Sequence, residues 1–300
     1  MHSSSAPKNG LPILADIHLH TRHSHGQAST AEMLQAARGR GLSVIGFSEH
    51  SPRPDGYRYP TDYQEKLRRE FGQYIEEVTK LARLSEDSRV TVLLGLELDY
   101  IPAREDYAAE LSRSHDYDYV IGGLHFQDDW GFDYSPDDWA RMDEGARFAA
   151  YERYYHDLTA MCRSGLFHVA AHPDLIKIFS IQSFRAWLER PAAIKAVSAA
   201  LTAMKEAGVI LEISSAGLRK PCAEIYPGPK IMNLAAAMDL PISFASDAHC
   251  INTPAHAFDE LARYAWSFGY RQHFVVQKGK RVPMSFSRPG PFANAANITP

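Results

Sequence analysis

The stretch Asp16-Ile17-His18-Leu19-His20 follows an apolar run at residues 11–15, as a buried strand does where it opens into a polar site. An extended strand has a period of two residues, so His18 and His20 lie on the same side and can hold one metal ion together. A polar loop that happens to contain two histidines would give the same sequence. The remainder of the chain decides between these two interpretations.

The same pattern of an apolar strand with a polar exit recurs along the chain. Predicted strands at residues 43–47, 90–94, 119–124, 167–171, 209–213 and 241–245 alternate with helices, including long ones at about 63–84 and 136–163. This alternation indicates a parallel sheet, and strands that are apolar throughout are buried on both faces. An open doubly wound sheet and a closed barrel both fit. We favour the barrel because ligand-type residues follow at least six strands, and only closure brings those ends together.

The composition is that of a globular protein without an obvious polyanionic partner. The chain has 300 residues, 45% of them hydrophobic, and a net charge of −4, so nothing favours nucleic-acid binding. Its three cysteines are widely spaced, and no signal peptide or membrane-length apolar run is evident, which predicts a cytoplasmic protein. We expect a flexible N-terminus at residues 1–10, one barrel domain at 11–282 and a Pro- and Gly-rich tail at 283–300.

Side chains that bind metals collect at the ends of the predicted strands. They are seven histidines and two carboxylates: His18, His20, His25, His50, Glu97, His125, His172, Asp247 and His249. A lone histidine is more often a surface or core residue, but chance does not place ligand-type residues after strand upon strand. Nine groups exceed the needs of one ion, so we expect two to three divalent ions, with Zn, Mn and Fe equally suitable. His23 is ambiguous, because it lies close by but ends no strand.

These motifs resemble the PHP (polymerase and histidinol phosphatase) family of metal-dependent phosphoesterases. The resemblance runs from about residue 16 to 268, and rests on Asp16-Ile17-His18-Leu19-His20-Thr21, Ser48-Glu49-His50, Gly95-Leu96-Glu97, Leu124-His125-Phe126, Ala171-His172-Pro173 and Ser246-Asp247-Ala248-His249. It implies a distorted (β/α)7 TIM-like barrel, with the metal site at the C-terminal ends of the strands. One departure is Glu49, which stands where the family more often has Asp.

The resemblance also implies how the ligands divide among three metals. The first metal would take His18, His20, Glu97 and Asp247; the second would share Glu97 and add His125 and His172; the third would take His25, His50 and His249. In the family the third-metal histidine precedes a small-residue stretch and a helix cap, as at residues 25–29. That favours His25 over His23 as the ligand.

Within the family, residues 174–177 and 212–221 resemble the histidinol-phosphatase branch. This implies hydrolysis of histidinol phosphate to histidinol and phosphate by a metal-bridging hydroxide, because clustered metals activate water and neutralise the phosphate oxygens. We expect Asp247, His249 and Arg219 to act in catalysis. Arg219 and Lys177, each just past a strand, are our candidates for binding the small phosphorylated substrate, with Arg22 and Arg53 weaker ones.

Other readings keep part of this interpretation. The same metals could serve another substrate, such as a nucleotide, a phosphodiester or a phosphotyrosine. The barrel could also be a non-catalytic metal-binding module, although a module without catalysis would be free to lose ligands, and the set here is complete. The aromatic loops at residues 57–63 and 126–134 could close over a small ring or pack as loop anchors, and the sequence does not decide.

Overall fold

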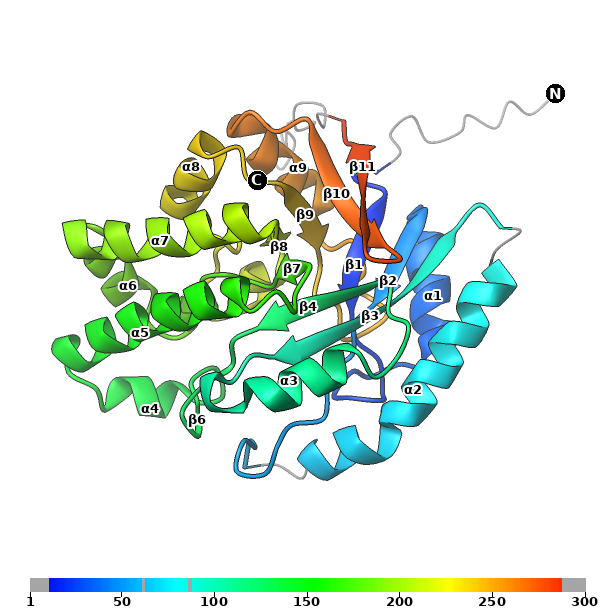
Figure 1. Ribbon diagram of the computed structural model, residues 1–300. Helices are drawn as coiled ribbons and strands as arrows, with labels where there is room; N and C mark the ends of the chain where they lie inside the picture. The colour runs from blue at the N-terminus through cyan, green and yellow to red at the C-terminus, as the bar shows by residue number, and fades with distance from the viewer. Residues whose placement is uncertain (1–10, 61–62, 86–87, 288–300) are drawn as a thin grey trace, which may run out of the picture.

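Seven parallel strands form the centre of the protein (Figure 1). The structure, a computed structural model, describes residues 11–60, 63–85 and 88–287. The strands are β1 (Ala15–Leu19), β2 (Val44–Phe47), β3 (Thr91–Asp99), β4 (Tyr119–Gly123), β7 (Val169–Ala170), β8 (Ile210–Ser214) and β9 (Ile242–Ala245), side by side in that order. The barrel closes just past β9, where Leu19 pairs with Ala248 and the His20 N–H donates to the Ala248 carbonyl at 2.8 Å. The predicted barrel of seven strands is confirmed.

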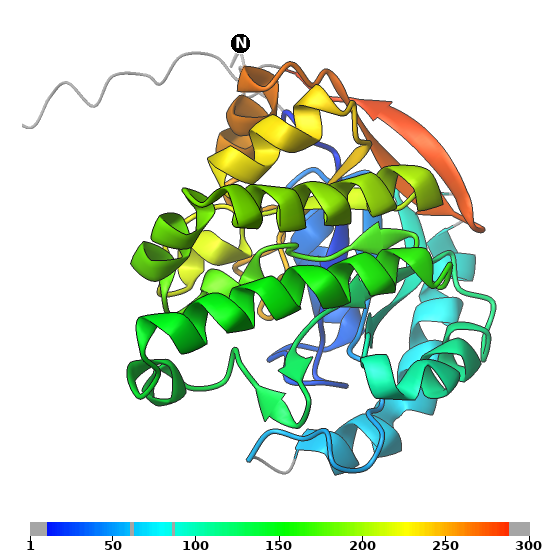
Figure 2. The same ribbon diagram turned by 60° about the vertical axis from the view of Figure 1, so that its left-hand side comes forward.

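Helices cover the outside of this barrel. They are α1 (Thr30–Gly39), α2 (Tyr63–Ser85), α3 (Glu105–Ser112), α4 (Pro136–Ala140), α5 (Glu144–Arg163), α6 (Ile181–Leu188), α7 (Pro191–Ala207), α8 (Pro229–Ala237) and α9 (Phe258–Ser267). Figure 2 shows α5 and α7 lying side by side across one flank. None of the helices in the described ranges is long and apolar enough to cross a bilayer.

The interior of the barrel is a small apolar core centred on Tyr119. Its hydroxyl donates to the Ile17 carbonyl at 2.6 Å. A Cβ on Gly46 would collide with that hydroxyl, and one on Gly95 would collide with the ring. Those two strand glycines therefore make room for the tyrosine. The ring fills the barrel and leaves the carboxyl ends of the strands for the site.

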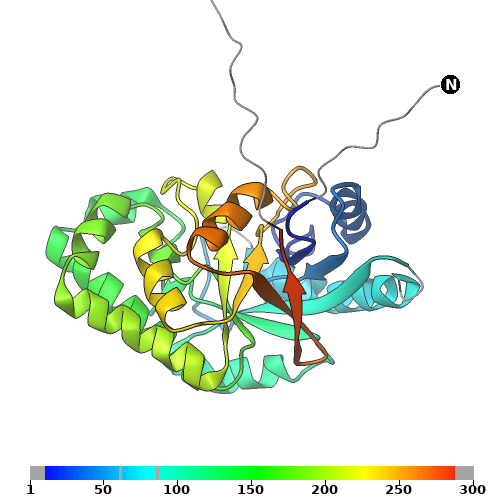
Figure 3. The ribbon, with the colours of Figure 1, turned by 90° about the horizontal axis from the view of Figure 1, so that it is seen from above.

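A hairpin closes the opposite, amino-terminal end of the barrel. It consists of β10 (Gln272–Gln277) and β11 (Lys280–Ser285), and Val275 and Val276 join the interior core (Figure 3). The second hairpin strand runs three residues past the predicted domain end at 282. The predicted flexible segment 1–10 and the tail beyond 287 lie outside the described residues.

Three predicted elements differ from the observed ones. The helix expected at 136–163 is two helices, because Asp143 accepts from the Ala146 N–H at 2.7 Å and starts α5 afresh. The strand expected at 90–94 continues to Asp99, so Glu97 lies within β3 rather than after it. The strand expected at 167–171 shortens to Val169–Ala170, which leaves His172 in the loop that follows.

Candidate metal centre and pocket

The first strand presents two buried histidines to the centre of the site, as its sequence predicts. His18 lies in β1 and His20 follows it, and neither side chain is exposed to solvent. Both Nε2 atoms approach Glu97 Oε2, at 3.3 and 3.4 Å, and His20 Nε2 is also 3.3 Å from Asp247 Oδ1. The loop after β9 supplies Asp247, so barrel closure between β1 and β9 assembles this group.

The Glu97 carboxylate lies among the ring nitrogens of five histidines. Its Oε1 atom is 3.1 Å from His172 Nε2 and 3.5 Å from His125 Nε2, and its Oε2 atom is 2.9 Å from His50 Nδ1. Gly123 in β4 allows this convergence, because a Cβ there would lie 2.6 Å from the His125 ring and 3.0 Å from Glu97. One carboxylate thus faces histidines from four separate segments of the chain.

A further group consists of imidazoles alone. The His50 and His249 rings both stack on His20, with ring centroids 4.4 and 4.3 Å from it, and the His25 ring centroid lies 4.1 Å from that of His249. The nitrogens of His20, His50 and His249 lie close enough together to hold one ion. The Nδ1 atom of His25 is bonded to the Tyr63 hydroxyl at 2.6 Å. Eight of the nine predicted ligands therefore form groups that could each hold an ion, whereas His25 lies beside the third group, in which His20 takes its place.

Two carboxylates behind the histidines fix which nitrogen carries the proton. Glu212 Oε2 is 2.7 Å from His18 Nδ1, and Asp99 Oδ1 is 2.5 Å from His125 Nδ1. An ionised carboxylate only accepts hydrogen bonds, so Nδ1 donates and the Nε2 lone pair turns to the site. Our sequence interpretation missed both residues, although an acidic residue inside an otherwise apolar strand at 209–213 was a usable signal.

Two of the candidate ligands have unusual backbone conformations. His172 has φ 26° and Asp247 has φ 50°, in the region that residues with a side chain seldom adopt. The His172 N–H donates to Glu212 at 3.1 Å. The Arg219 guanidinium donates to the carbonyls of Ser246 and Asp247 at 2.7 and 3.0 Å. These contacts hold the His172 side chain toward Glu97 and the Asp247 side chain toward His18 and His20.

Asp16 in β1 binds the segment that follows β9. Its carboxylate accepts from Ser246 N–H at 3.0 Å, Ser246 Oγ at 2.5 Å and Ala255 N–H at 2.9 Å. Asp16 thereby ties β1 to the segment that carries Asp247 and His249.

The charge states of two carboxylates and two histidines suit cation binding. Burial alone would raise the pKa of Glu97 and of Asp247, but the facing histidines outweigh it and hold both pKa values well below their usual range. Burial lowers the pKa of His50 to about 4 and that of His249 to about 3. At neutral pH the carboxylates are therefore ionised and these two imidazoles are neutral, which are the forms that bind metal.

Unpartnered buried atoms test whether metals fit here. His18 Nε2, His20 Nε2, His50 Nδ1, His249 Nε2 and Glu97 Oε2 are all buried without a hydrogen-bond partner. Such groups carry a desolvation cost unless something satisfies them. A cation between them removes that cost, and the nitrogen and oxygen donors are those of zinc, manganese and iron sites. The residues present fit divalent ions.

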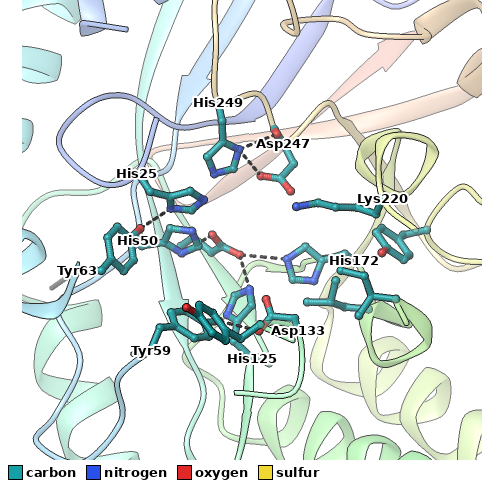
Figure 4. A pocket seen from close by; sticks show the side chains of 15 residues that line it. His25, His50, Tyr59, Tyr63, His125, Asp133, His172, Lys220, Asp247 and His249 are labelled. Atoms are coloured by element: carbon teal, nitrogen blue, oxygen red, sulfur yellow. Dashed lines mark hydrogen bonds and ion pairs between the residues drawn. The ribbon is translucent and has the colours of Figure 1, made fainter. Parts of the chain in front are cut away.

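The ligand cluster forms the floor of a pocket of about 290 Å³. The loops after the strands and the first residue of α2 supply its walls, which are the aromatic rings of Tyr59, Tyr63, Tyr134 and Tyr226, the aliphatic Leu175 and Ile178, and the charged Asp133 and Lys220. In Figure 4 the Lys220 amine extends toward Asp247 and His172, whereas Asp133 lies beside Tyr59 and His125. Tyr59 donates its hydroxyl to Asp133 at 2.7 Å, which joins two of the loops. The pocket is thus cationic on one side and anionic on another.

Comparison with known proteins identifies the family of this chain. A family model described as the PHP domain matches residues 16–216. The chain belongs to the PHP family. Over 237 residues it is 35% identical to a Deinococcus radiodurans protein named probable histidinol-phosphatase, covering 79% of this chain and 86% of that one. It is 27% identical over 265 residues to the histidinol-phosphatase of Bacillus subtilis, covering 81% and 96% of the two chains.

Solved structures share the PHP barrel. A Lactococcus lactis histidinol phosphate phosphatase, solved with zinc, L-histidinol and phosphate, superposes with a TM-score of 0.72 at 15% identity, covering 89% of this chain and 98% of that one. A Listeria monocytogenes chain superposes with a TM-score of 0.69 at 22% identity, covering 79% and 96%. At these identities the likeness establishes the fold.

Lys177 and Arg219, predicted to bind substrate because each lies just past a strand, do not line the pocket. Lys177 is 0% exposed and pairs with Asp174 at 2.6 Å and Glu224 at 2.7 Å. Two carboxylates already neutralise it, so it joins loops rather than meeting substrate. Arg219 is half-buried and donates to backbone carbonyls, as described above. Lys220, the next residue, is the exposed cation that lines the pocket.

His23 lies outside the PHP ligand cluster. Its Nε2 atom is 3.0 Å from Glu77 and its Nδ1 atom is 3.5 Å from Glu70, both on α2. Its neighbour His25 lines the pocket instead. The choice of His25 over His23 therefore agrees with where the structure places the two rings, and a metal-binding role for His25 stays a prediction.

Proposed function

We propose that this PHP-family chain is a metal-dependent phosphatase that hydrolyses L-histidinol phosphate to L-histidinol and phosphate. The observation that carries the proposal is the gathering of Glu97, Asp247 and six histidines into three ligand groups, at the floor of a pocket with one cation and one carboxylate in its walls. Support comes from the curated relatives named for histidinol-phosphatase activity, and from the Lactococcus lactis neighbour, whose structure contains zinc, L-histidinol and phosphate.

Two to three divalent ions would be held by three groups, two of which share His20. These are His18, His20 and Asp247; Glu97, His125 and His172; and His20, His50 and His249, with His25 beside the last. Bound there, divalent ions supply a water-derived nucleophile near neutral pH and neutralise charge on the phosphoryl oxygens. Zn, Mn and Fe all suit this donor set.

The pocket walls fit the remainder of such a substrate. Lys220 offers a point charge for phosphate oxygens at the pocket wall. The buried Lys177 is instead paired with carboxylates such as Asp174. Asp133, held by Tyr59, offers an acceptor for the amine or ring N–H of histidinol. The tyrosine rings provide apolar walls for an imidazole. In this arrangement the phosphate lies over the ligand cluster and the organic part lies toward Asp133.

Catalytic roles for Asp247, His249 and Arg219 follow from their places. Asp247 and His249 act as ligands beside the phosphate. Arg219 acts indirectly, because it holds the backbone carbonyls of Ser246 and Asp247 and does not line the pocket. It is therefore a positioning residue in this proposal.

A substrate panel tests the proposal. Phosphate release is measured from histidinol phosphate, nucleotides, phosphotyrosine and a phosphodiester, with the protein as purified, after chelation, and after Mn²⁺, Zn²⁺ or Fe²⁺ is restored. We expect histidinol phosphate to be hydrolysed with the highest kcat/KM, and the activity to disappear and return with metal. A preference for another ester would keep the metal centre and refute the substrate. Metal binding without any hydrolysis would favour a non-catalytic module.

A further inference from the structure

Arg53 is a buried cation beside the ligand cluster that the proposed reaction does not use. Its side chain is 1% exposed, and its Nε–H donates to Asp99 Oδ2 at 2.6 Å. Its guanidinium carbon lies 5.1, 5.6 and 5.3 Å from the ring centroids of Tyr59, Tyr63 and Phe126. A buried guanidinium is costly unless a charge and π faces compensate it. Arg53 is thus held by one carboxylate inside an aromatic cage.

The backbone of Arg53 is fixed as firmly as its side chain. Its carbonyl accepts from Gln64 Nε2 at 3.1 Å and from Arg68 Nη2 at 3.1 Å, both on α2. Two residues earlier, the Ser51 N–H donates to the Glu97 carbonyl at 2.8 Å. The segment between β2 and α2 is therefore anchored both to a helix and to the strand that carries Glu97.

Asp99 transmits this anchoring to a metal-ligand candidate. One of its oxygens accepts from Arg53, and the other faces His125 Nδ1 at 2.5 Å. With each oxygen committed to a different partner, the carboxylate cannot rotate without losing one bond. His125 then keeps its proton on Nδ1 and its Nε2 lone pair toward Glu97, 3.5 Å away.

We propose that Arg53 is a positioning residue that, through Asp99, fixes His125 as a ligand and so raises the affinity of the Glu97–His125–His172 group for a divalent ion. The inference rests on the metal-binding part of the proposed function and not on its substrate. Because Tyr59 and Tyr63 also line the pocket, the same guanidinium links the pocket wall to this ligand group.

Two other roles for Arg53 make different predictions. A phosphate-binding role would change KM and leave metal affinity untouched, and Arg53 does not line the pocket. A purely structural role would lower thermal stability and leave the affinity of the folded protein for metal untouched. Metal affinity of the folded protein therefore separates the proposal from both.

The test uses the full-length apo-protein and Co²⁺ alone. Co²⁺ stoichiometry, affinity in competition with a chelator and the visible d–d spectrum are measured for wild type, Arg53→Met, Asp99→Asn and the double variant. Replacing an outer partner of a ligating histidine typically costs 10- to 100-fold in affinity. We expect one Co²⁺ to bind about 10- to 100-fold more weakly in Asp99→Asn and about tenfold more weakly in Arg53→Met. The double variant should match Asp99→Asn, because Arg53 acts through Asp99.

Two further variants keep the test decisive. Arg153→Met removes an exposed arginine that pairs with Asp128 on the surface, and it should bind Co²⁺ like wild type. Arg53→Lys retains a cation beside Asp99, and it should lose less Co²⁺ affinity than Arg53→Met. If Arg53→Met does not fold, Arg53→Lys should still lose less Co²⁺ affinity than Asp99→Asn.

Specific results would overturn the inference. These are wild-type Co²⁺ affinity and spectrum in folded Arg53→Met or, if that variant does not fold, an Arg53→Lys loss as large as that of Asp99→Asn. Losses that add in the double variant would also overturn it. Wild-type protein that binds Co²⁺ but does not hydrolyse histidinol phosphate would refute the proposed substrate alone. The weaker binding of one Co²⁺ ion by Asp99→Asn and Arg53→Met would then still support the role of Arg53.

Discussion

The floor and the walls of the pocket are built in different ways. The floor consists of histidines and carboxylates that lie on strands or directly after them, buried and backed by further carboxylates such as Glu212 and Asp99. The walls come from loops, and their charged members, Asp133 and Lys220, lie far from one another in sequence. Chemistry common to a family belongs to the rigid floor, whereas the choice of substrate belongs to the loops. The following predictions test that division.

The largest effect is expected from Glu97→Gln on the floor. The substitution keeps the shape of the side chain but removes the charge that faces His18, His50 and His172. Losing several kcal/mol of transition-state stabilisation should lower kcat/KM at least about a thousandfold, with bound metal also reduced. Steady-state kinetics and elemental analysis check this, with the exposed Glu152→Gln on α5 as the matched control. Activity near wild type would remove Glu97 from the centre.

Lys177→Met should affect stability rather than substrate binding. The change leaves Asp174 and Glu224 without their buried partner. Breaking a buried pair in this way typically costs about 3–5 kcal/mol, which for a chain of this size lowers Tm by roughly 10 °C. Calorimetry measures the Tm, and KM is measured below the transition. A raised KM with unchanged Tm would return Lys177 to the substrate site.

Lys220→Met should affect substrate binding rather than stability. The side chain is exposed at the pocket, so its loss should leave Tm and metal content nearly unchanged. A hydrogen bond to a charged group is worth about 1.5–3 kcal/mol, which predicts a fall in kcat/KM of about 10- to 100-fold. The Arg153→Met variant serves as a surface control. Kinetics identical to wild type would exclude Lys220 from phosphate binding.

The smallest effect is expected from Tyr59→Phe. This variant keeps the ring beside Arg53 and Tyr134 but removes the hydroxyl that donates to Asp133 at 2.7 Å. One hydrogen bond of about 0.5–1.5 kcal/mol predicts a rise of about 2- to 10-fold in KM for histidinol phosphate. Inorganic phosphate, measured as a competitive inhibitor, should bind as before. An equal change for both ligands would show that Tyr59 does not act through Asp133.

The sequence predicted the floor well because topology fixes it. Parallel strands in a closed barrel bring their carboxyl ends to one place, so His18, His50 and Asp247 could be grouped without knowing any contact between them. Asp99 was harder to recognise, because the strand was expected to end at residue 94 and continues to Asp99. The role of Glu212 depends on its distance from His18 across the barrel, which only the folded chain shows.

The walls could not be predicted in the same way. Lys177 and Lys220 both follow a strand within a few residues, and nothing local distinguishes the buried one from the exposed one. The difference arises because Glu224, 47 residues away, folds back onto Lys177. Likewise, Asp133 becomes a pocket residue through Tyr59, on another loop. Such long-range loop contacts have no periodic signature.

The central claim is that the strand-end cluster holds divalent ions. The most direct measurement is anomalous diffraction at the zinc or manganese absorption edge, on crystals of the metal-loaded protein grown with histidinol and phosphate. The account predicts two or three anomalous peaks about 2.0–2.3 Å from the nitrogens and oxygens grouped around Glu97, with phosphate beside them. A loaded protein without peaks there, or with its metal bound elsewhere, would contradict the account.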